Sequence, residues 1–381
     1  MRFIILSVDY EIFGNGSGDV RQHVIEPTER MARLCQQHHV PLTVFFEAEE
    51  YVAFVQHASQ LKKDLGYDPA ALIRQQVISL IQNGHDVQLH LHPEWYGARY
   101  EAGRWLLHPK KTTVDALFET QAEVTAYIAS RKKLIEEMAA KANPSRRVRA
   151  YRAGAFSAQP GQKLLTGLAE NGIFIDSSVV KGLHSASQGF DYRQAPSAKG
   201  PWRVSDDVAR QDACGPVWEF PIYSVMGRRF NQLTLNRLRA KFSKNVPKDK
   251  QKEMITQLGI QPSNPFAVLK FLWQAVPIKL DFHNLSTARL LDLICSAPKP
   301  ANGDPDVLML IGHTKEHVDD QRFNQLLAAI VRKPDVKVIS LDNLATLVQP
   351  VLDGGGHPHA VGSGRVSIGD GLPECLLKVK D

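Results

Sequence analysis

The sequence predicts an α/β protein built around a parallel β-sheet. Short apolar runs alternate along most of the chain with stretches of helical periodicity, which is the pattern of successive βα units. A hydrophobic fraction of 43% and a charged fraction of 23% are those of an ordinary globular protein, so disorder and coiled coils are not favoured. Strands are expected at residues 3–8, 42–46, 86–91, 150–152, 174–176, 217–221, 307–311 and 336–340. Helices are expected at residues 26–38, 69–83, 113–142, 160–171 and 320–331.

Glycine punctuation supports this order of elements. Asn83-Gly84 and Asn171-Gly172 each end a helical stretch immediately before an expected strand. The alternation favours either a barrel or a doubly wound sheet, and in both folds ligands bind just beyond the carboxyl ends of the strands. The polar motifs described below fall at such ends, which makes them candidate site residues.

The 381 residues predict one large domain with an insertion and a tail. Residues 1–350 hold the alternating elements. At about residues 226–282 the alternation lapses into a basic stretch that we interpret as a helical insertion. A solvated helical surface is its simplest role, and peripheral contact with an anionic glycan or membrane is the alternative. Residues 351–381 are rich in glycine and are expected to form a flexible C-terminal tail.

Charge and apolar content bound the partners and the location. A net charge of +6 is a mild surplus that fits an anionic substrate or surface, and nucleic-acid binding is not expected. The apolar run before Asp9 is too short for a signal peptide, and no run approaches the roughly 20 residues of a membrane-spanning helix, so a cytoplasmic location is expected. The four cysteines contain no CxxC pair, which argues against a thiolate zinc site.

Two acids end the first expected strand, in the run Ser7-Val8-Asp9-Tyr10-Glu11. Because strand side chains alternate with a period of two, Asp9 and Glu11 share one side. One carboxylate of such a pair can bind a metal while the other accepts a proton. Two solvated acids at a strand end are an equally simple interpretation of this motif alone.

A histidine pair ends the third expected strand. The run from Gly84 to Trp95 delivers His90 and His92 to the same face, with Glu94 two residues further on. Neutral imidazoles suit zinc and similar divalent ions, and a nearby carboxylate completes a site that keeps one position open. A lone histidine is usually structural, but this concentration of histidines and acids favours a metal site.

Three further strand ends carry single candidates. Arg152, before the small-residue turn Ala153-Gly154-Ala155, can pair with a catalytic carboxylate, although a surface arginine is the simpler interpretation. Asp176 ends the next strand, where a helix N-cap is the simpler role. His313 follows a buried strand and a glycine, and its unperturbed pKa near 6.5 suits a general acid; a structural histidine is the alternative.

Taken together and in this order, these segments resemble the polysaccharide deacetylase superfamily, the NodB-like carbohydrate esterases. The resemblance covers about residues 3–345, and the stretch PLTVFF at residues 41–46 is similar to the second strand of that family. It implies a distorted (β/α)7 barrel with the helical insertion described above. By the same resemblance Asp9 is the base, His90 is a metal ligand and Arg152 positions Asp9. His313 would protonate the leaving amine, and Asp176 would orient His313.

Two departures from the family pattern concern the metal. The family's second aspartate directly follows the base, whereas this chain has Tyr10 there and Glu11 one residue later. The family's second histidine lies four residues after the first, where this chain has Glu94, and His92 comes early. The expected ligands are therefore Glu11, His90 and His92, with Glu94 in reserve. They would hold one divalent ion, with zinc expected and manganese or cobalt as alternatives.

The expected function is removal of an N-acetyl or other acyl group from a carbohydrate. The expected substrate is an acetylated sugar, free or linked to a lipid or nucleotide, as a precursor in cell-surface polysaccharide synthesis. One alternative is a glycoside hydrolase, which would need a second acid across from Asp9, with Glu47 and Glu219 as candidates. The other is a catalytically inactive barrel that binds a glycan or a partner protein.

Overall fold

The computed structural model describes residues 1–108, 111–229, 273–300 and 305–348. The tail expected at residues 351–381 and residues 230–272 of the expected insertion lie outside these ranges. Within them, no helix is long and apolar enough to cross a membrane.

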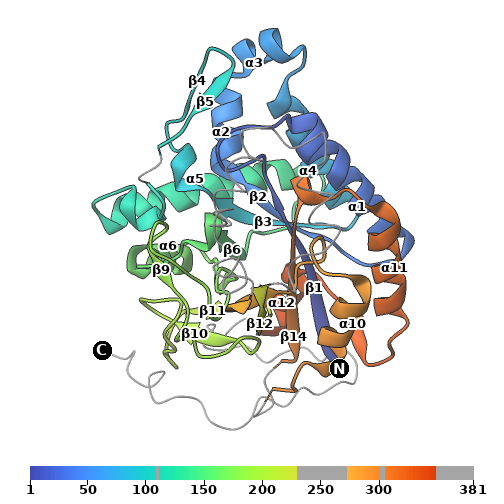
Figure 1. The fold of residues 1–381 in the computed structure, drawn as a ribbon. Coiled ribbons are helices and arrows are strands. Elements are labelled where there is room, and N and C mark those ends of the chain that lie inside the picture. Colours follow the sequence, from blue (N-terminus) through green and yellow to red (C-terminus); the bar gives the residue numbers. More distant parts are fainter. Residues whose placement is uncertain (109–110, 230–272, 301–304, 349–381) are drawn as a thin grey trace, which may run out of the picture.

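Seven parallel strands form the centre of the molecule (Figure 1). In spatial order they are β11 (Val217–Glu219), β7 (Ile175–Asp176), β6 (Ala150–Ala153), β3 (Asp86–Leu91), β2 (Thr43–Glu47), β1 (Arg2–Tyr10) and β14 (Val307–His313). The sheet curls until its two ends meet. The evidence is a parallel bridge between Ile222, just after β11, and Met309 of β14. The α/β fold with a distorted seven-stranded barrel is therefore as the sequence predicted.

Two more strands extend this sheet. β10 (Trp202–Val204) pairs antiparallel with β11, and β15 (Val336–Val338) pairs parallel with the first residues of β1. Small antiparallel pairs lie outside the sheet: β4 (Arg99–Glu101) with β5 (Arg104–Leu106), β8 (His184–Ser185) with β9 (Phe190–Asp191), and β12 (Ser224–Arg228) with β13 (Ala275–Lys279). At its described ends the expected helical insertion is therefore not helical: β12 and β13 pair there as a two-stranded antiparallel ribbon.

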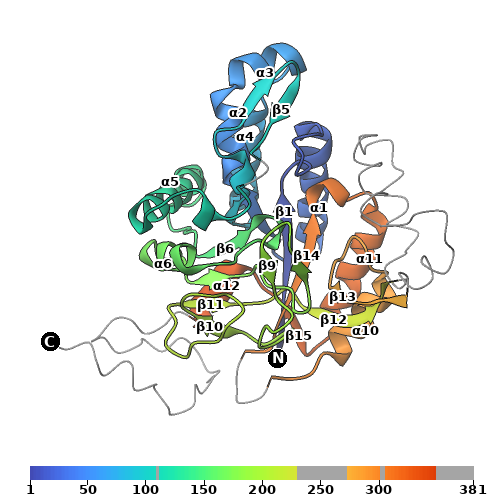
Figure 2. The ribbon, with the colours of Figure 1, turned by 60° about the vertical axis from the view of Figure 1, so that its left-hand side comes forward.

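Helices flank the barrel (Figure 2). They are α1 (Glu26–Gln37), α2 (Ala48–Gln56), α3 (Ala58–Leu65), α4 (Pro69–Gln82), α5 (Gln121–Ala140), α6 (Gln162–Glu170), α10 (Thr287–Ser296), α11 (Asp320–Val331) and α12 (Leu341–Val348). The helix expected from residue 113 begins later, at α5, because Thr120 and Glu123 form a capping box there. Both views place α2, α3 and the β4–β5 hairpin together at one end of the molecule.

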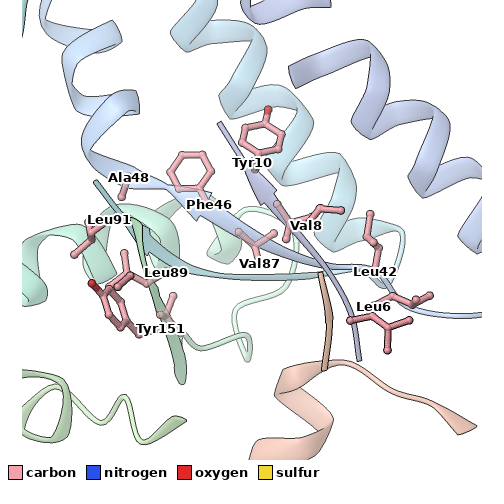
Figure 3. Close-up of a cluster of buried hydrophobic side chains, with 14 of the residues drawn as sticks. Leu6, Val8, Tyr10, Leu42, Phe46, Ala48, Val87, Leu89, Leu91 and Tyr151 are labelled. Carbon is pink, nitrogen blue, oxygen red and sulfur yellow. The ribbon is translucent and has the colours of Figure 1, made fainter. Parts of the chain in front are cut away.

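Side chains of the central strands alternate between the barrel interior and the helices outside. Ile5 of β1 belongs to an interior apolar cluster, whereas Leu6 and Val8 belong to the cluster shared with the surrounding helices. Figure 3 shows part of this outer cluster, where Leu6 and Val8 of β1 and Phe46 of β2 are labelled. Because side chains of a strand alternate between its two faces, Asp9 points into the barrel interior like Ile5. Asp9 lies near the carboxyl end of β1, the end at which barrel proteins carry their functional sites.

The last described helix covers the opposite end of the barrel. Leu341 and Leu344 of α12 belong to the interior apolar cluster. The backbone N–H of Asp342 donates to Oδ2 of Asp86 over 3.0 Å, and Asp86 is the first residue of β3. The N-terminus of α12 is therefore held at the amino ends of the strands, away from the candidate site.

Candidate active site and metal centre

The strand register brings four of the candidate residues together. Asp9 and His313 are direct partners in the pairing of β1 with β14. His90 and Arg152 are direct partners in the pairing of β3 with β6. Residues in register point to the same side of a sheet. His313 therefore points inward with Asp9, and Arg152 points inward with His90.

Arg152 is fully buried and fixes Asp9. Its Nη1 lies 2.6 Å from Oδ1 of Asp9, its Nη2 donates to Oγ of Ser7 over 2.9 Å, and its Nε donates to the carbonyl of Ser177 over 3.0 Å. The guanidinium also stacks over the ring of Phe45, 4.0 Å from the centroid. Burial alone would raise the pKa of Asp9, but Arg152 beside it, with help from His90 and His313, holds that pKa below its ordinary value.

Glu11, His90 and His92 offer ligand atoms that all lie within 4.8 Å of one another. Oε2 of Glu11 is 2.7 Å from Nε2 of His92 and 3.6 Å from Nε2 of His90. All three residues are buried. The structure therefore brings the three expected ligands to one point.

The hydrogen bonding of His90 suits a metal ligand. Its Nδ1 lies 2.8 Å from the carbonyl oxygen of Arg152, which assigns the proton to Nδ1 and leaves a lone pair on Nε2. That buried Nε2 has no hydrogen-bond partner among the described residues. An orphaned imidazole nitrogen that faces a carboxylate and a second imidazole fits a divalent ion of the zinc type.

Glu94, the reserve ligand, lies on the other side of His92. Its Oε2 is 3.7 Å from Nδ1 of His92, whereas Glu11 faces Nε2 of the same ring. Gly154 packs against this ring as well, since a Cβ added at Gly154 would fall 2.5 Å from His92 Cγ. Glu94 and Gly154 thus position the ring of His92, and the close approach explains why a side chain is absent at Gly154.

Lys315 is a site residue that the sequence analysis missed. Its Nζ lies 2.6 Å from Oε1 of Glu11 and donates to the carbonyl of Ile12 over 2.9 Å. Burial would raise the pKa of Glu11, but Lys315 and His92 hold it well below its ordinary value. The period-two rule gave no signal for it, because Lys315 lies on the 3-10 turn Thr314–Glu316 beyond the end of β14.

His313 lies between two carboxylates. Its Nε2 is 3.5 Å from Oδ2 of Asp9, and its Nδ1 is 3.5 Å from Oε2 of Glu316. Burial would lower the pKa of His313, but Glu316 and then Asp9 raise it above its ordinary value. Asn284 Nδ2 donates to Glu316 Oε2 over 3.2 Å and to Asp281 Oδ2 over 2.6 Å, so Glu316 is itself held in place.

Asp176 has other partners than the one expected for it. It is in register with Tyr151, whose side chain belongs to the outer apolar cluster. Asp176 therefore lies on the outer face of the sheet, whereas the next residue after Tyr151, Arg152, points inward. Its Oδ1 accepts from Oγ of Ser178 over 2.6 Å, and the pKa values of Asp176 and neighbouring Glu219 are both raised, chiefly by burial. The carboxylate that faces Nδ1 of His313 is Glu316 instead.

Two further acids hold the backbone of the candidate ligands. Oε1 of Glu47 accepts a hydrogen bond from the backbone N–H of His92 over 2.5 Å. Both carboxylate oxygens of Glu50 accept from the backbone N–H of Ile12, at 3.3 and 3.2 Å, directly after Glu11. These buried contacts fix the two chain segments that carry Glu11 and His92.

No protein-family profile matches the chain, and no curated protein matches it in sequence. Similar solved structures include two proteins described as polysaccharide deacetylases and one described as a branching enzyme. The protein from Mycobacterium smegmatis is 12% identical, with a TM-score of 0.46 over 95% of this chain and 94% of its own. The one from Pseudomonas aeruginosa is 11% identical, with a TM-score of 0.43 over 90% and 89%. The branching enzyme from Pyrococcus horikoshii is 10% identical, with a TM-score of 0.47 over 96% and 74%.

Proposed function

We propose that this chain is a metal-dependent hydrolase that removes an N-acetyl or other acyl group from a carbohydrate. One observation carries the proposal. The ligand atoms of Glu11, His90 and His92 converge beside Asp9, a carboxylate that Arg152 keeps ionised. Metal-assisted amide hydrolysis uses these two features together, because the carbonyl is polarised and a water molecule loses a proton.

The proposed ion is zinc, with manganese or cobalt as alternatives. Two imidazoles and one carboxylate are a ligand set that suits zinc and leaves a position open. A divalent ion held there supplies Lewis acidity, which polarises a carbonyl and makes water more acidic. Glu11, His90 and His92 would hold it, and the hydrogen bond between His90 Nδ1 and the Arg152 carbonyl would fix the orientation of one ligand.

Asp9 is the proposed base. Its lowered pKa keeps the carboxylate unprotonated at neutral pH, so Oδ2 is available to take a proton while Arg152 holds Oδ1. A carboxylate of lowered pKa is a weak base, which is why Asp9 depends on water that is already acidified. Arg152 acts on Asp9 and is a positioning residue.

His313 is the proposed acid. Its raised pKa, caused by Glu316 and Asp9 against the effect of burial, favours the protonated ring at neutral pH. A protonated His313 can donate to the amine that leaves when the carbon–nitrogen bond breaks. We assign to Glu316 the orienting role that the family resemblance gave to Asp176, because Glu316 faces Nδ1 of the ring.

The proposed substrate class is an acetylated sugar, free or linked to a lipid or nucleotide, in cell-surface polysaccharide synthesis. It rests on the motif resemblance. The glycoside hydrolase alternative is less favoured because its candidate second acids are engaged elsewhere. Glu47 accepts from the backbone of His92, Glu219 accepts from the backbone N–H of Val179 over 3.1 Å, and both are buried.

Metal content and acetate release test the proposal together. Purified wild-type protein and His90→Ala would be analysed for elements and then supplied with N-acetylated sugars. We expect about one divalent ion per wild-type chain, lost together with acetate release in His90→Ala. The exposed His184→Ala serves as the control and should match wild type in both measurements. If the wild-type protein binds no zinc, manganese or cobalt, the metal mechanism is wrong. Tight metal binding without release of acetate would favour the catalytically inactive barrel.

A further inference from the structure

The two carboxylate oxygens of Glu11 have different surroundings. Oε2 faces the two histidines, 2.7 Å from His92 Nε2 and 3.6 Å from His90 Nε2. Oε1 faces away from them and lies 2.6 Å from Nζ of Lys315. A largely buried lysine, 11% exposed, therefore contacts one oxygen of Glu11, while the other oxygen completes the ligand cluster.

Lys315 is held where it is by more than this ion pair. Its ammonium also donates to the carbonyl of Ile12 over 2.9 Å and lies 5.7 Å from the centroid of the Phe13 ring. The backbone N–H of Ile12 is anchored in turn by Glu50. Lys315 belongs to the short 3-10 turn Thr314–Glu316 that directly follows β14, so its backbone starts from a rigid strand end.

A cation in this position has two consequences for a divalent ion. Because Lys315 engages Oε1, Oε2 is the oxygen that Glu11 offers to the ligand cluster, and binding of one ion through both oxygens is disfavoured. The positive charge of Lys315 also repels the ion inside a buried site, where electrostatic interactions are weakly screened. Both effects lower the affinity of the site, and the first keeps its coordination number low.

We propose that Lys315 is a positioning residue of the metal site, which reserves Oε1 of Glu11 for itself and leaves the ion a single carboxylate oxygen. The site then has three protein ligands, retains an open position for substrate, and binds its ion less tightly than the same ligands would without Lys315. This inference rests on the proposed metal-dependent function. Lys315 is not itself a ligand, but it determines which oxygen of Glu11 the ion binds.

Two substitutions separate the two effects. Lys315→Met removes the charge and frees Oε1, whereas Lys315→Gln removes the charge but keeps an N–H that can donate to Oε1. The affinity of each protein for Co²⁺ would be measured by titration against a competing chelator, and the visible absorption of bound Co²⁺ would report coordination number, since four-coordinate Co²⁺ absorbs more strongly than five- or six-coordinate Co²⁺. Lys133→Met is the control, because Lys133 is exposed and pairs with Glu137 on α5.

We expect both Lys315 variants to bind Co²⁺ on the order of tenfold more tightly than wild type, through loss of the repelling charge. The absorption should weaken only in Lys315→Met, where the second oxygen can join the ion. Unchanged or weaker binding in the variants would overturn the inference, as would an unchanged spectrum in Lys315→Met. If Lys315→Met does not fold, the affinity of Lys315→Gln decides alone. Wild-type protein that binds no Co²⁺ or Zn²⁺ would overturn the proposed function itself.

Discussion

Nε2 of His313 lies 3.5 Å from Oδ2 of Asp9, on the neighbouring strand and directly opposite in register. The proposed acid and the proposed base are thus fixed relative to each other by the β1–β14 pairing. Arg152 holds the other oxygen of the same carboxylate. A negatively charged Asp9 between two cationic groups explains its lowered pKa, and Asp9 contributes in return to the raised pKa of His313.

Replacing Glu316 with glutamine should lower the pKa of His313. Glu316 is the largest influence that raises this pKa, so its loss should move the alkaline limb of the kcat profile to lower pH by about one unit. The pKa of His313 itself can be followed by NMR titration, which needs no turnover. Asp176→Asn is the comparison, and its alkaline limb should stay in place. A shift in Asp176→Asn but not in Glu316→Gln would contradict the roles assigned here.

Removing the guanidinium of Arg152 should destabilise the fold as well as the site. Arg152→Ala leaves Asp9 buried without its ion-pair partner, and the loss of one member of a buried pair costs about 3–5 kcal/mol. Arg152→Lys should recover only part of this stability. The lysine restores a positive charge beside Asp9, but its ammonium cannot make the three-way contact with Asp9, Ser7 and Ser177. Urea unfolding measures both variants. A loss below about 1 kcal/mol in Arg152→Ala would show that Asp9 finds another partner.

Adding a methyl group at Gly154 should displace His92. The new Cβ would lie 2.5 Å from the ring, and the ring is confined by Glu11 on one side and Glu94 on the other. We expect Gly154→Ala to weaken Zn²⁺ binding by about 10–100-fold, the size of effect seen when a ligand loses its support. Gly14→Ala is the matched control, since nothing lies within 4 Å of its added Cβ. Equal affinity in the two variants would mean that His92 is not a ligand.

The stability of the barrel should fall as pH rises through the titration of Asp86. Burial raises the pKa of Asp86 to about 6, so the folded state holds this proton more tightly than the unfolded chain. The resulting stabilisation is fully present below about pH 4 and is lost as the pH rises to about 6, a total of about 3 kcal/mol.

Asp86→Asn tests this because it removes the titrating group. The free energy of unfolding of wild type minus that of the variant should decrease across this pH range. Chemical unfolding at pH 4, 5, 6 and 7 measures it. A difference independent of pH would show that Asp86 titrates normally in the folded state.

Much of the fold could be predicted from the sequence because β strands buried on both faces are recognisable as apolar runs. The same period-two rule placed Asp9 with Glu11 and His90 with His92. In the structure the ligand atoms of Glu11, His90 and His92 converge, and Asp9 lies close enough to Glu11 for their charges to interact. The helices α2 and α3 were not predicted. α2 holds the acidic run around Glu49, whose ion pair with Arg131 on α5 is a tertiary contact that local periodicity does not reveal.

Asp176, and not Glu316, was expected to face His313, and the difference has a physical cause. The side of a strand on which Asp176 lies depends on its register with β6, and a shift of one residue reverses the answer. Glu316 was overlooked because it lies on a 3-10 turn beyond the strand, where three residues complete one turn and return the side chain to His313. Register and turn geometry are set by tertiary packing, so neither assignment could be read from one segment alone.

The pairing of β1 with β14 also constrains how the chain acquires its structure. Phe3 pairs with Val307 and also with Lys337, so the edge of β1 that faces away from β2 finds its partners only near the end of the described chain. Contacts between residues so distant in sequence make folding slow, because the loop between them must close before the pairing repays its cost in entropy. During synthesis β1 would leave the ribosome about 300 residues ahead of β14, with an apolar edge exposed throughout. The site that joins Asp9 to His313 is therefore assembled last.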